Sequence, residues 1–427
     1  MRQRLLQLSA SSLLFAAIVL VNAGNYAINL LLGRVLGPAA FAEAGLLATG
    51  VLMLSFLALG FQLTAAKYGA GDNPETRSIG HRLARAATRT GVAIAVLLAL
   101  GAEPLRQFLH FQSALPFYLL VPVIPLYLRT SVGRGLLQGE LRFGRLAGSY
   151  LLEMVGRLLA TGLLIGALIY WGGDHVSEAV ALGFGVGFVA AYRPVRATFG
   201  EATGGELPAA VRRQVVAFLF VMGAYEGCQL LISHSDVILV KHYFDAETAG
   251  LYTALALIGR VVFFATWSVV TLLFPKVAQR ERSGLPHTGL FNRSLAAVAG
   301  LGGSIVVACY GWSDWVVYAL FGPEFASVGP LLWRYALATL LFACANVFAY
   351  YYLSLGRYLP AVLTGVAGLL QVLLVVALHE SIQQLLYVQI AVMSGLFLAL
   401  AILHYVPQYF GLPVFQGVRA PLLLTKE

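Results

Sequence analysis

The chain contains 427 residues, of which 59% are hydrophobic and only 11% are charged, with a formal net charge of +9. Soluble domains carry about 25% charged residues, so this composition excludes a soluble enzyme, a secreted disulfide scaffold and a nucleic-acid-binding domain. Cys228, Cys309 and Cys344 lie in apolar runs and are expected to pack as small hydrophobic residues. We therefore expect an integral membrane protein along its whole length, with no nucleic-acid partner.

A helix needs roughly 20 apolar residues to cross the hydrocarbon core of a bilayer. Segments of this kind recur along the chain, and none alternates with the period of a barrel strand. In chain order they are Leu5–Leu32, Ala42–Tyr68, Leu83–Leu100, Leu115–Leu137, Leu146–Tyr170, Val176–Ala191, Val215–Tyr243, Ala249–Phe274, Leu290–Phe321, Val328–Leu355, Leu359–Leu378 and Ile382–Val406. Pro116, Pro122 and Pro125 predict kinks in the fourth segment. The sequence thus predicts an all-α integral membrane protein with about 12 transmembrane helices.

Basic residues gather in one set of the loops and tails that join these spans. Arg77, Arg82, Arg85 and Arg89 form a basic stripe there, whereas the opposite loops are mostly acidic. By the positive-inside rule the basic set faces the cytoplasm. We therefore expect a multi-pass protein of the cytoplasmic (inner) membrane with both termini in the cytoplasm. The basic stripe is expected to contact anionic membrane lipids.

Polar side chains inside the predicted spans are expected to face cavities or partners. Two helical stripes stand out, namely Asn22, Asn25 and Asn29 on the first span, and Glu226, Gln229, Ser233 and Asp236 on the seventh. Interhelical hydrogen bonding is one interpretation of these stripes. Because the two helices are equivalent in the internal repeat described below, we favour the other interpretation, in which both line a shared central cavity.

Four charged residues inside later spans need an explanation. Glu153 and Arg157 in the fifth span are four residues apart, which predicts a structural ion pair on one helix face. Arg260 in the eighth span and Arg334 in the tenth have no carboxylate within a helical turn. They either form buried ion pairs with an acidic residue of the seventh span or bind an anionic ligand, because a guanidinium binds phosphate through two parallel hydrogen bonds.

An internal repeat divides the chain into two halves. Residues 32–46 parallel 240–252, residues 62–67 parallel 271–276, and residues 137–143 parallel 352–358. These similar segments fall at the same span of each half. Because each half has an even number of spans, six, both halves begin on the same side of the membrane and the repeat is parallel, an arrangement that transporters use. We expect an N-terminal six-helix lobe over 1–197, a cytoplasmic linker over 198–213 and a C-terminal six-helix lobe over 214–427.

Several short motifs are similar to those of a known transporter family. They are LGRVLGP at 32–38, LQG at 137–139, DVILV at 236–240, AGLY at 249–252 and Pro275. In this order and spacing, the chain resembles the multidrug/oligosaccharidyl-lipid/polysaccharide (MOP) exporter superfamily, in its polysaccharide-transporter branch. The resemblance implies a MATE-like, V-shaped pair of lobes. It also implies a flippase for lipid-linked oligosaccharide, such as the precursor of O-antigen or another cell-surface polysaccharide.

We therefore expect a non-enzymatic flippase that moves polyprenyl-pyrophosphate-linked oligosaccharide from the inner to the outer leaflet by alternating access. The residues expected to contact this substrate are Arg260 and Arg334 at the pyrophosphate, and Asn22, Asn25, Asn29 and Gln229 at the sugar hydroxyls. Glu226 and Asp236 are expected to bind H+ or Na+ as the coupling ion. No cofactor or metal is expected, and further partners would be a polysaccharide polymerase or export machinery.

Three alternatives stay open at this point. A cation-coupled multidrug exporter of the same superfamily would use Glu226 and Asp236 to hold an amphipathic cation. A membrane polysaccharide polymerase or ligase is the enzyme alternative, but such enzymes need a sizeable external loop and the predicted external connections are short. A structural membrane scaffold is disfavoured by the intramembrane arginines and carboxylates.

Overall fold

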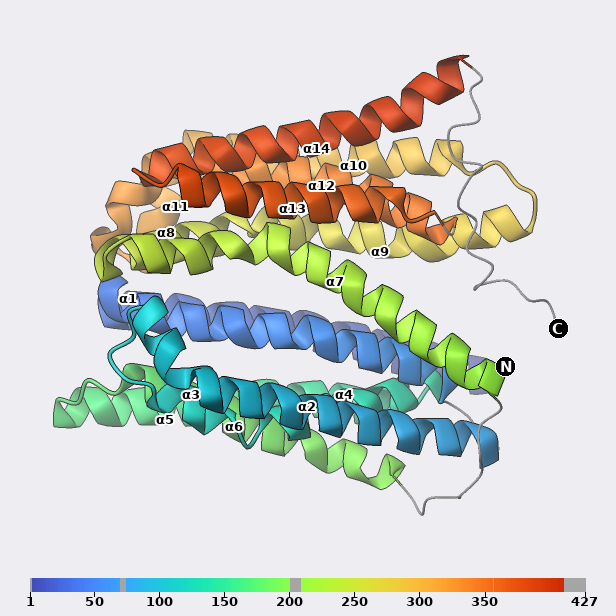
Figure 1. Ribbon diagram of the computed structural model, residues 1–427, viewed down its shortest axis with the longest axis horizontal. Helices are drawn as coiled ribbons and strands as arrows, with labels where there is room; N and C mark the ends of the chain where they lie inside the picture. The colour runs from blue at the N-terminus through green and yellow to red at the C-terminus, as the bar shows by residue number, and fades with distance from the viewer. Residues whose placement is uncertain (1, 70–73, 200–208, 356, 411–427) are drawn as a thin grey trace. The chain divides into compact units, whose positions relative to one another are not determined.

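The computed structural model describes residues 2–69, 74–199, 209–355 and 357–410, and the regular elements in these ranges are helices (Figure 1). The N-terminal half contains α1 (Arg2–Tyr68), α2 (Pro74–Phe108), α3 (Leu115–Leu120), α4 (Ile124–Gly139), α5 (Phe143–Trp171), α6 (Val176–Val195) and the short η1 (Arg196–Thr198). The C-terminal half contains α7 (Ala209–Tyr243), α8 (Ala246–Gly259), α9 (Val261–Arg282), α10 (Thr288–Gly311), α11 (Ser313–Phe321), η2 (Pro323–Leu331), α12 (Leu332–Ser354), α13 (Leu359–Ala377) and α14 (Ile382–Phe410). The all-helical prediction is confirmed.

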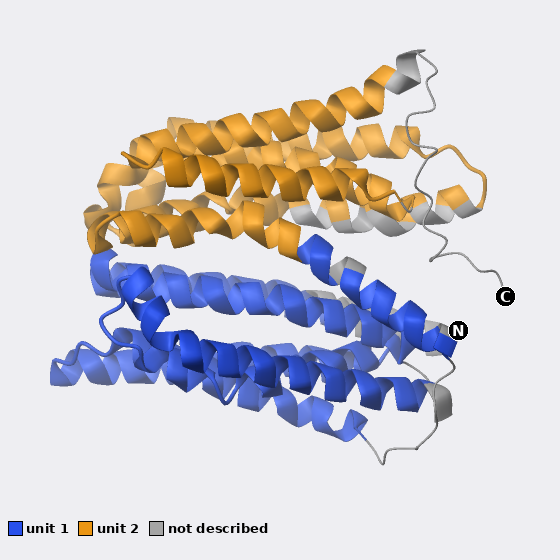
Figure 2. Cartoon of the chain, in the orientation of Figure 1, with its two compact units in different colours: residues 1–226 blue, residues 227–427 orange. Residues whose placement is uncertain are grey.

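The chain divides into two compact units, residues 1–226 and residues 227–427 (Figure 2). The division falls inside α7, whereas the sequence places the junction at 198–213, of which residues 200–208 lie outside the described residues. The start of α7 belongs to the first unit because Phe218 packs on the end of α1. The Phe218 ring lies 5.8 Å from the Tyr68 ring and 4.3 Å from the Lys67 ammonium. The parallel six-helix repeat stays a prediction.

Ten helices among the described residues are long and apolar enough to cross a membrane, so the chain is a multi-pass membrane protein. The sequence predicts about 12 spans, and two features account for the difference. One candidate, Ala16–Tyr68, is 53 residues long and covers residues 16–32 of the first predicted span together with the whole of the second. The predicted fourth span is divided between α3 and α4, and neither of these is long enough alone.

The long helix α1 is interrupted near its middle. Gly37 has φ 73° and ψ 173°, a backbone conformation that residues with a Cβ rarely adopt. Pro38 follows, and it has no N–H to continue the helical hydrogen bonds. The two residues therefore separate α1 into two helical segments at the place where the hydropathy pattern ends one span and begins the next.

The break between α3 and α4 has a similar cause. Helix α3 ends at Leu120 and α4 begins at Ile124, with Pro122 in the gap and Pro125 in the first turn of α4. Proline removes a backbone donor and fixes φ, so an uninterrupted helix is disfavoured at this place. The kink that the prolines predict is therefore present.

Helix α4 is the central helix of the first unit, where it packs against α1, α2 and α6. Its contact with α1 is close because Gly135 has no side chain. A Cβ at Gly135 would overlap the backbone carbonyl of Gln62 on α1. This close approach also lets the Gln62 side chain donate a hydrogen bond of 2.9 Å to Gln138 on α4.

Helix α12 has the same central place in the second unit, where it packs against α9, α10 and α14. Phe348 meets Phe291 of α10 at a ring-centroid distance of 5.0 Å, and Phe342 stacks on Phe263 of α9 at 5.6 Å. Apolar side chains elsewhere point outward, as Leu163 does with 73% of its surface exposed. Such exposure suits a surface in contact with lipid.

Candidate functional site

A buried carboxylate on α7 is the centre of a polar cluster in the second unit. Asp236 is only 1% exposed, and its Oδ1 lies 3.2 Å from Arg260 Nη2. Its Oδ2 accepts hydrogen bonds from the hydroxyls of Tyr252 and Tyr335, at 2.9 and 2.8 Å. Gln389 Nε2 donates a third bond to Oδ2 at 2.9 Å. Donors from α8, α12, α14 and the junction after α8 therefore meet on one carboxylate.

The cluster holds Arg260 within the protein. Arg260 is the residue at which α8 ends and the chain continues into α9. Besides its ion pair with Asp236, its Nη2 donates to the backbone carbonyl of Ser233 at 2.9 Å. Removing a carboxylate or a guanidinium from water costs several kcal/mol unless the group is paired and hydrogen-bonded, and here Asp236 (1% exposed) and Arg260 (14% exposed) are each other's partner. Of the two environments that the sequence leaves open for Arg260, the structure contains the buried ion pair.

The other members of the α7 stripe have different surroundings. Gln229 Nε2 donates a 2.6 Å hydrogen bond to Asn346 Oδ1 on α12, which is also buried. Glu226 is 7% exposed, and among the described residues its carboxylate has no hydrogen bond or ion pair. Of the four stripe residues, Gln229, Ser233 and Asp236 therefore bond to groups of the second unit, and Glu226 is a buried carboxylate without a described partner.

A second charged cluster joins α4, α5 and α6 in the first unit. Arg134 Nη2 of α4 lies 2.6 Å from Glu153 Oε2 of α5. Arg134 Nε also donates to Ser149 Oγ at 2.9 Å, and that hydroxyl donates to the Ala191 carbonyl of α6 at 2.8 Å. The guanidinium lies over the Tyr150 ring, 4.1 Å from its centroid. These contacts satisfy a cation whose side chain is 4% exposed.

The partner of Glu153 differs from the one that the sequence predicts. Its ion pair is with Arg134 rather than with Arg157, because α4 brings a competing cation that helix spacing within α5 cannot reveal. Arg157 instead donates from Nη2 to Asn25 Oδ1 on α1. Its guanidinium lies 4.8 Å from the centroid of the Phe184 ring. Within the described residues its Nε has no hydrogen-bond partner.

The remaining predicted substrate residues are dispersed. On α1, Asn29 donates to the backbone carbonyl four residues earlier at 2.7 Å, and Asn22 is exposed. On α12, Arg334 lies 5.2 Å from the Trp333 ring centroid and 5.7 Å from that of Tyr387. In the part of the chain that the structure describes, Arg334 has no carboxylate within ion-pair distance. The structure thus brings Asn25 to Arg157 but does not place Arg334 beside an acidic residue.

Sequence reasoning missed several members of the two clusters, among them Arg134, Tyr252, Tyr335 and Gln389. Arg134 carried a signal, because it is a charge inside the predicted fourth span. Tyr252 belongs to the AGLY motif at 249–252, but nothing in that motif indicates a carboxylate as its partner. Tyr335 and Gln389 lie 99 and 153 residues from Asp236, so only the tertiary structure reveals these contacts.

The two clusters can provide charge-assisted hydrogen bonds. The first unit presents a net positive charge near Arg157, because Arg134 and Glu153 neutralise each other. In the second unit, Arg260 and Asp236 also neutralise each other. Among the described residues no group of three or more His, Cys, Asp or Glu side chains would hold a metal ion.

Comparison with known proteins identifies the fold. No family model and no curated relative matches the sequence. The solved structure of the lipid II flippase MurJ in an inward closed conformation matches with a TM-score of 0.71 and 13% identity, covering 93% of this chain and 87% of that chain. MATE in complex with MaD3S matches with a TM-score of 0.62 and 14% identity, over 94% and 93% of the chains. An outward-facing multidrug resistance MATE family transporter of the MOP superfamily matches with a TM-score of 0.60 and 13% identity, covering 95% of this chain and 94% of that chain. The chain therefore has the fold of MOP superfamily transporters.

Proposed function

We propose that this protein is a flippase and not an enzyme. It moves a polyprenyl-pyrophosphate-linked oligosaccharide from the inner to the outer leaflet of the cytoplasmic membrane by alternating access, for cell-surface polysaccharide synthesis. A saccharide cannot cross hydrocarbon unaided, because each hydroxyl without a hydrogen-bond partner costs several kcal/mol there. A protein path that supplies such partners removes this barrier, while the polyprenyl chain stays in the lipid.

The observation that carries the proposal is the position of Arg157. It is a guanidinium within a membrane-spanning helix whose described hydrogen-bond partner is the neutral side chain of Asn25 rather than a carboxylate. A cation in this setting is costly unless an anion or water compensates it. A pyrophosphate would provide that compensation through charge-assisted hydrogen bonds, whereas a cationic drug would be repelled.

The structure changes the roles that we propose for individual residues. Arg157 replaces Arg260 as the main phosphate ligand, because Arg260 is engaged by Asp236 and would have to leave it. Arg334 stays a candidate for the same role. Asn25 and Asn29 are proposed to bond sugar hydroxyls next to Arg157.

The remaining predicted site residues receive roles from their surroundings. Asn22 is exposed on α1 and is proposed to meet sugar hydroxyls during passage. Gln229 and Asp236 are proposed to support the second unit, since their side chains already bond to protein groups. Glu226 is the proposed site for H+ or Na+, because no described group neutralises it.

The test is an export assay in a strain that lacks the gene. Mass spectrometry of extracted lipids should detect accumulated polyprenyl-linked oligosaccharide, together with loss of surface polysaccharide. Complementation with the wild-type gene or with Arg145→Gln should reverse both effects, because Arg145 is an exposed arginine outside the clusters. Complementation with Arg157→Gln should fail although the protein reaches the membrane. Full complementation by Arg157→Gln would remove Arg157 from the site.

A polymerase or ligase would also cause lipid-linked single repeats to accumulate, so their leaflet must be determined. Repeats that accumulate in the inner leaflet support the flippase, and repeats in the outer leaflet support the enzyme. A periplasmic glycosidase that cleaves only outward-facing headgroups makes this distinction in intact spheroplasts.

One observation favours a second candidate, a cation-coupled multidrug exporter. Glu226 is a buried carboxylate without a described partner, and such a group can hold an amphipathic cation. Unchanged lipid-linked sugar in the deletion strain, together with Glu226-dependent efflux of cationic dyes, would favour this candidate. In that experiment Glu226→Gln should abolish dye efflux, whereas Arg157→Gln should not reduce it.

A further inference from the structure

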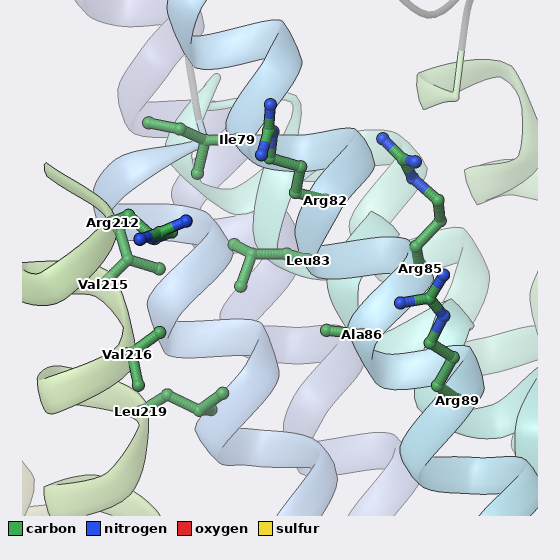
Figure 3. A pocket seen from close by; sticks show the side chains of 10 residues that line it. All are labelled: Ile79, Arg82, Leu83, Arg85, Ala86, Arg89, Arg212, Val215, Val216 and Leu219. Carbon is green, nitrogen blue, oxygen red and sulfur yellow. The ribbon is translucent and has the colours of Figure 1, made fainter. Parts of the chain in front are cut away.

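A pocket of about 370 Å³ lies in the first unit between α2 and the start of α7 (Figure 3). Four of the residues that line it are arginines, three from α2 and one from α7. They are Arg82, Arg85, Arg89 and Arg212. The three on α2 have the spacing i, i+3 and i+7, which places them along one face of the helix. The volume lies within the range of small-ligand sites, about 300–1,000 Å³.

Positively charged side chains dominate the polar lining of this pocket. No described acidic residue lines it. Arg85, Arg89 and Arg212 are exposed and form no ion pair with a described carboxylate. Like charges brought together repel one another, so the arrangement favours an anionic ligand that several guanidinium groups share.

Apart from Arg212, the wall of the pocket that α7 forms is apolar. Val215, Val216 and Leu219 of α7 lie across from Leu83 of α2 (Figure 3). Val216 keeps 59% of its surface exposed, which suits contact of this hydrophobic side chain with lipid near the edge of a predicted membrane span. A free phosphate or an acidic peptide would use the arginines but would leave this wall uncovered. A lipid covers both parts, since it joins an anionic headgroup to a hydrocarbon chain.

We propose that this pocket binds the phosphate of an anionic lipid, with the guanidinium groups on the headgroup and the first part of the chain along the valines. The arginines lie at the end of α2 that the charge distribution predicts to face the cytoplasm. Two sources share this chemistry, a bulk anionic phospholipid and a polyprenyl diphosphate. The second source rests on the proposed flippase function, in which the pocket would be a loading site for the substrate.

The experiment measures lipid binding to the purified full-length protein in a neutral detergent by native mass spectrometry. The probes are phosphatidylglycerol, a polyprenyl diphosphate, the neutral lipid phosphatidylcholine and inorganic pyrophosphate. The test variant is Arg85→Gln/Arg89→Gln. The matched control is Arg145→Gln/Arg293→Gln, which removes two exposed arginines that lie outside the pocket. Each basic residue near an anionic lipid contributes favourable electrostatic free energy to binding. The loss of two such residues should therefore weaken the affinity of the protein for the anionic lipids by about tenfold or more.

Weaker binding of both anionic lipids to the test variant, but not to the control, supports a general lipid-phosphate site. Weaker binding of the polyprenyl diphosphate alone supports the substrate as the occupant. Equal affinities for test and control variants would overturn the proposal. Inorganic pyrophosphate binding as tightly as the lipids would overturn the role of the apolar wall.

Two further variants keep the test decisive if the double variant does not fold. Arg212→Gln removes a charge from the opposite helix and should weaken the same lipids. Val216→Ser should weaken lipid binding while leaving the weak binding of inorganic pyrophosphate unchanged. The assay reads binding, so it does not depend on export. If Arg157→Gln leaves export unchanged, the proposed substrate site at Arg157 is refuted, but the lipid affinities of the pocket are unaffected. If the pocket variants leave lipid binding unchanged, the pocket proposal is refuted, but the export result for Arg157 is unaffected.

Discussion

Arg260 and Arg157 are both guanidinium groups within membrane-spanning helices, but they have different partners. Arg260 faces a carboxylate that three further side chains also bind. Arg157 faces an amide oxygen. A cation that is already paired with a buried carboxylate contributes to the fold, whereas a cation without one remains able to bind an anion. Because of this difference, we propose a structural role for Arg260 and a substrate role for Arg157.

Replacing Asp236 by alanine should destabilise the protein strongly. The substitution leaves the Arg260 guanidinium, whose side chain is 14% exposed, without its counter-ion, and breaking a pair that is mostly buried costs up to about 3–5 kcal/mol. Thermal unfolding in detergent measures the effect. The exposed acid Asp314 provides the control as Asp314→Ala, which should change stability by less than about 0.5 kcal/mol. Equal unfolding temperatures for both variants would contradict the role of the cluster.

Asp245 caps the first turn of α8 and gives a pH-dependent prediction. Hydrogen bonds from the Thr248 side chain and its backbone N–H, the latter at 3.0 Å, lower the pKa of Asp245 below its ordinary value of 3.8. The ionised cap therefore adds stability above the unfolded pKa, and this contribution is lost as the pH falls through the lower folded pKa. Asp245→Ala should cost about 0.5–2 kcal/mol at neutral pH.

The pH titration of thermal stability checks this prediction. The difference between wild type and Asp245→Ala should shrink as the pH is lowered below the ordinary aspartate pKa. A neighbouring control, Glu247→Ala, should show a smaller difference, because Asp245 provides the capping side chain of α8. A difference that grows with acid would contradict the capping role.

At the level of helices, the close packing of α1 against α4 depends on a residue without a side chain at their contact. Helices α1 and α4 approach each other at Gly135, where no side chain intervenes. Helix α4 is in turn the helix that carries Arg134 to Glu153 on α5. The position of the Arg134–Glu153 ion pair therefore depends on Gly135, which lies at the contact between α4 and α1.

Gly135→Ala should destabilise the first unit by about 1–3 kcal/mol, because the added methyl would overlap the Gln62 carbonyl and backbone atoms cannot move aside easily. Gly148→Ala on α5 is the matched control, since a Cβ there meets nothing within 4 Å. That control should be neutral or stabilising by up to about 1 kcal/mol, as for glycine replacements within exposed helix. If thermal unfolding shows that both variants lower the stability, or that both raise it, the proposed overlap at Gly135 is contradicted.

Hydropathy predicted most helices because a membrane span must be long and apolar wherever it lies in the fold. The end of the first span before residue 37 and the break beside Pro122 were also expected, and in the structure Gly37, Pro38 and Pro122 supply their local backbone cause. The partners of the buried charges were not. The pairing of Glu153 with Arg134 depends on which helix lies beside α5, and a spacing rule within one helix carries no such information.

The molecule as a whole has a predicted orientation that accessibility experiments can test. In a variant without the three native cysteines, Ser283→Cys after α9 should react only with a reagent that reaches the cytoplasm. Asp174→Cys between α5 and α6 should react with an impermeant reagent added outside. Both positions are exposed. Reversed labelling of the two positions would contradict the orientation that the positive-inside rule gives.

The carboxylate cluster of Asp236 also affects how the chain is made. Synthesis proceeds at about 5–20 residues per second. Arg260 follows Asp236 by 24 residues, so it emerges within about 1–5 seconds at that rate. Gln389 follows by 153 residues and emerges only after about 8–30 seconds. During insertion, Asp236 of the nascent second unit therefore gains its counter-ion Arg260 early, but its hydrogen bonds stay incomplete until Gln389 has been synthesised. Ribosome stalling before α14 should leave this unit exposed to membrane quality-control proteases.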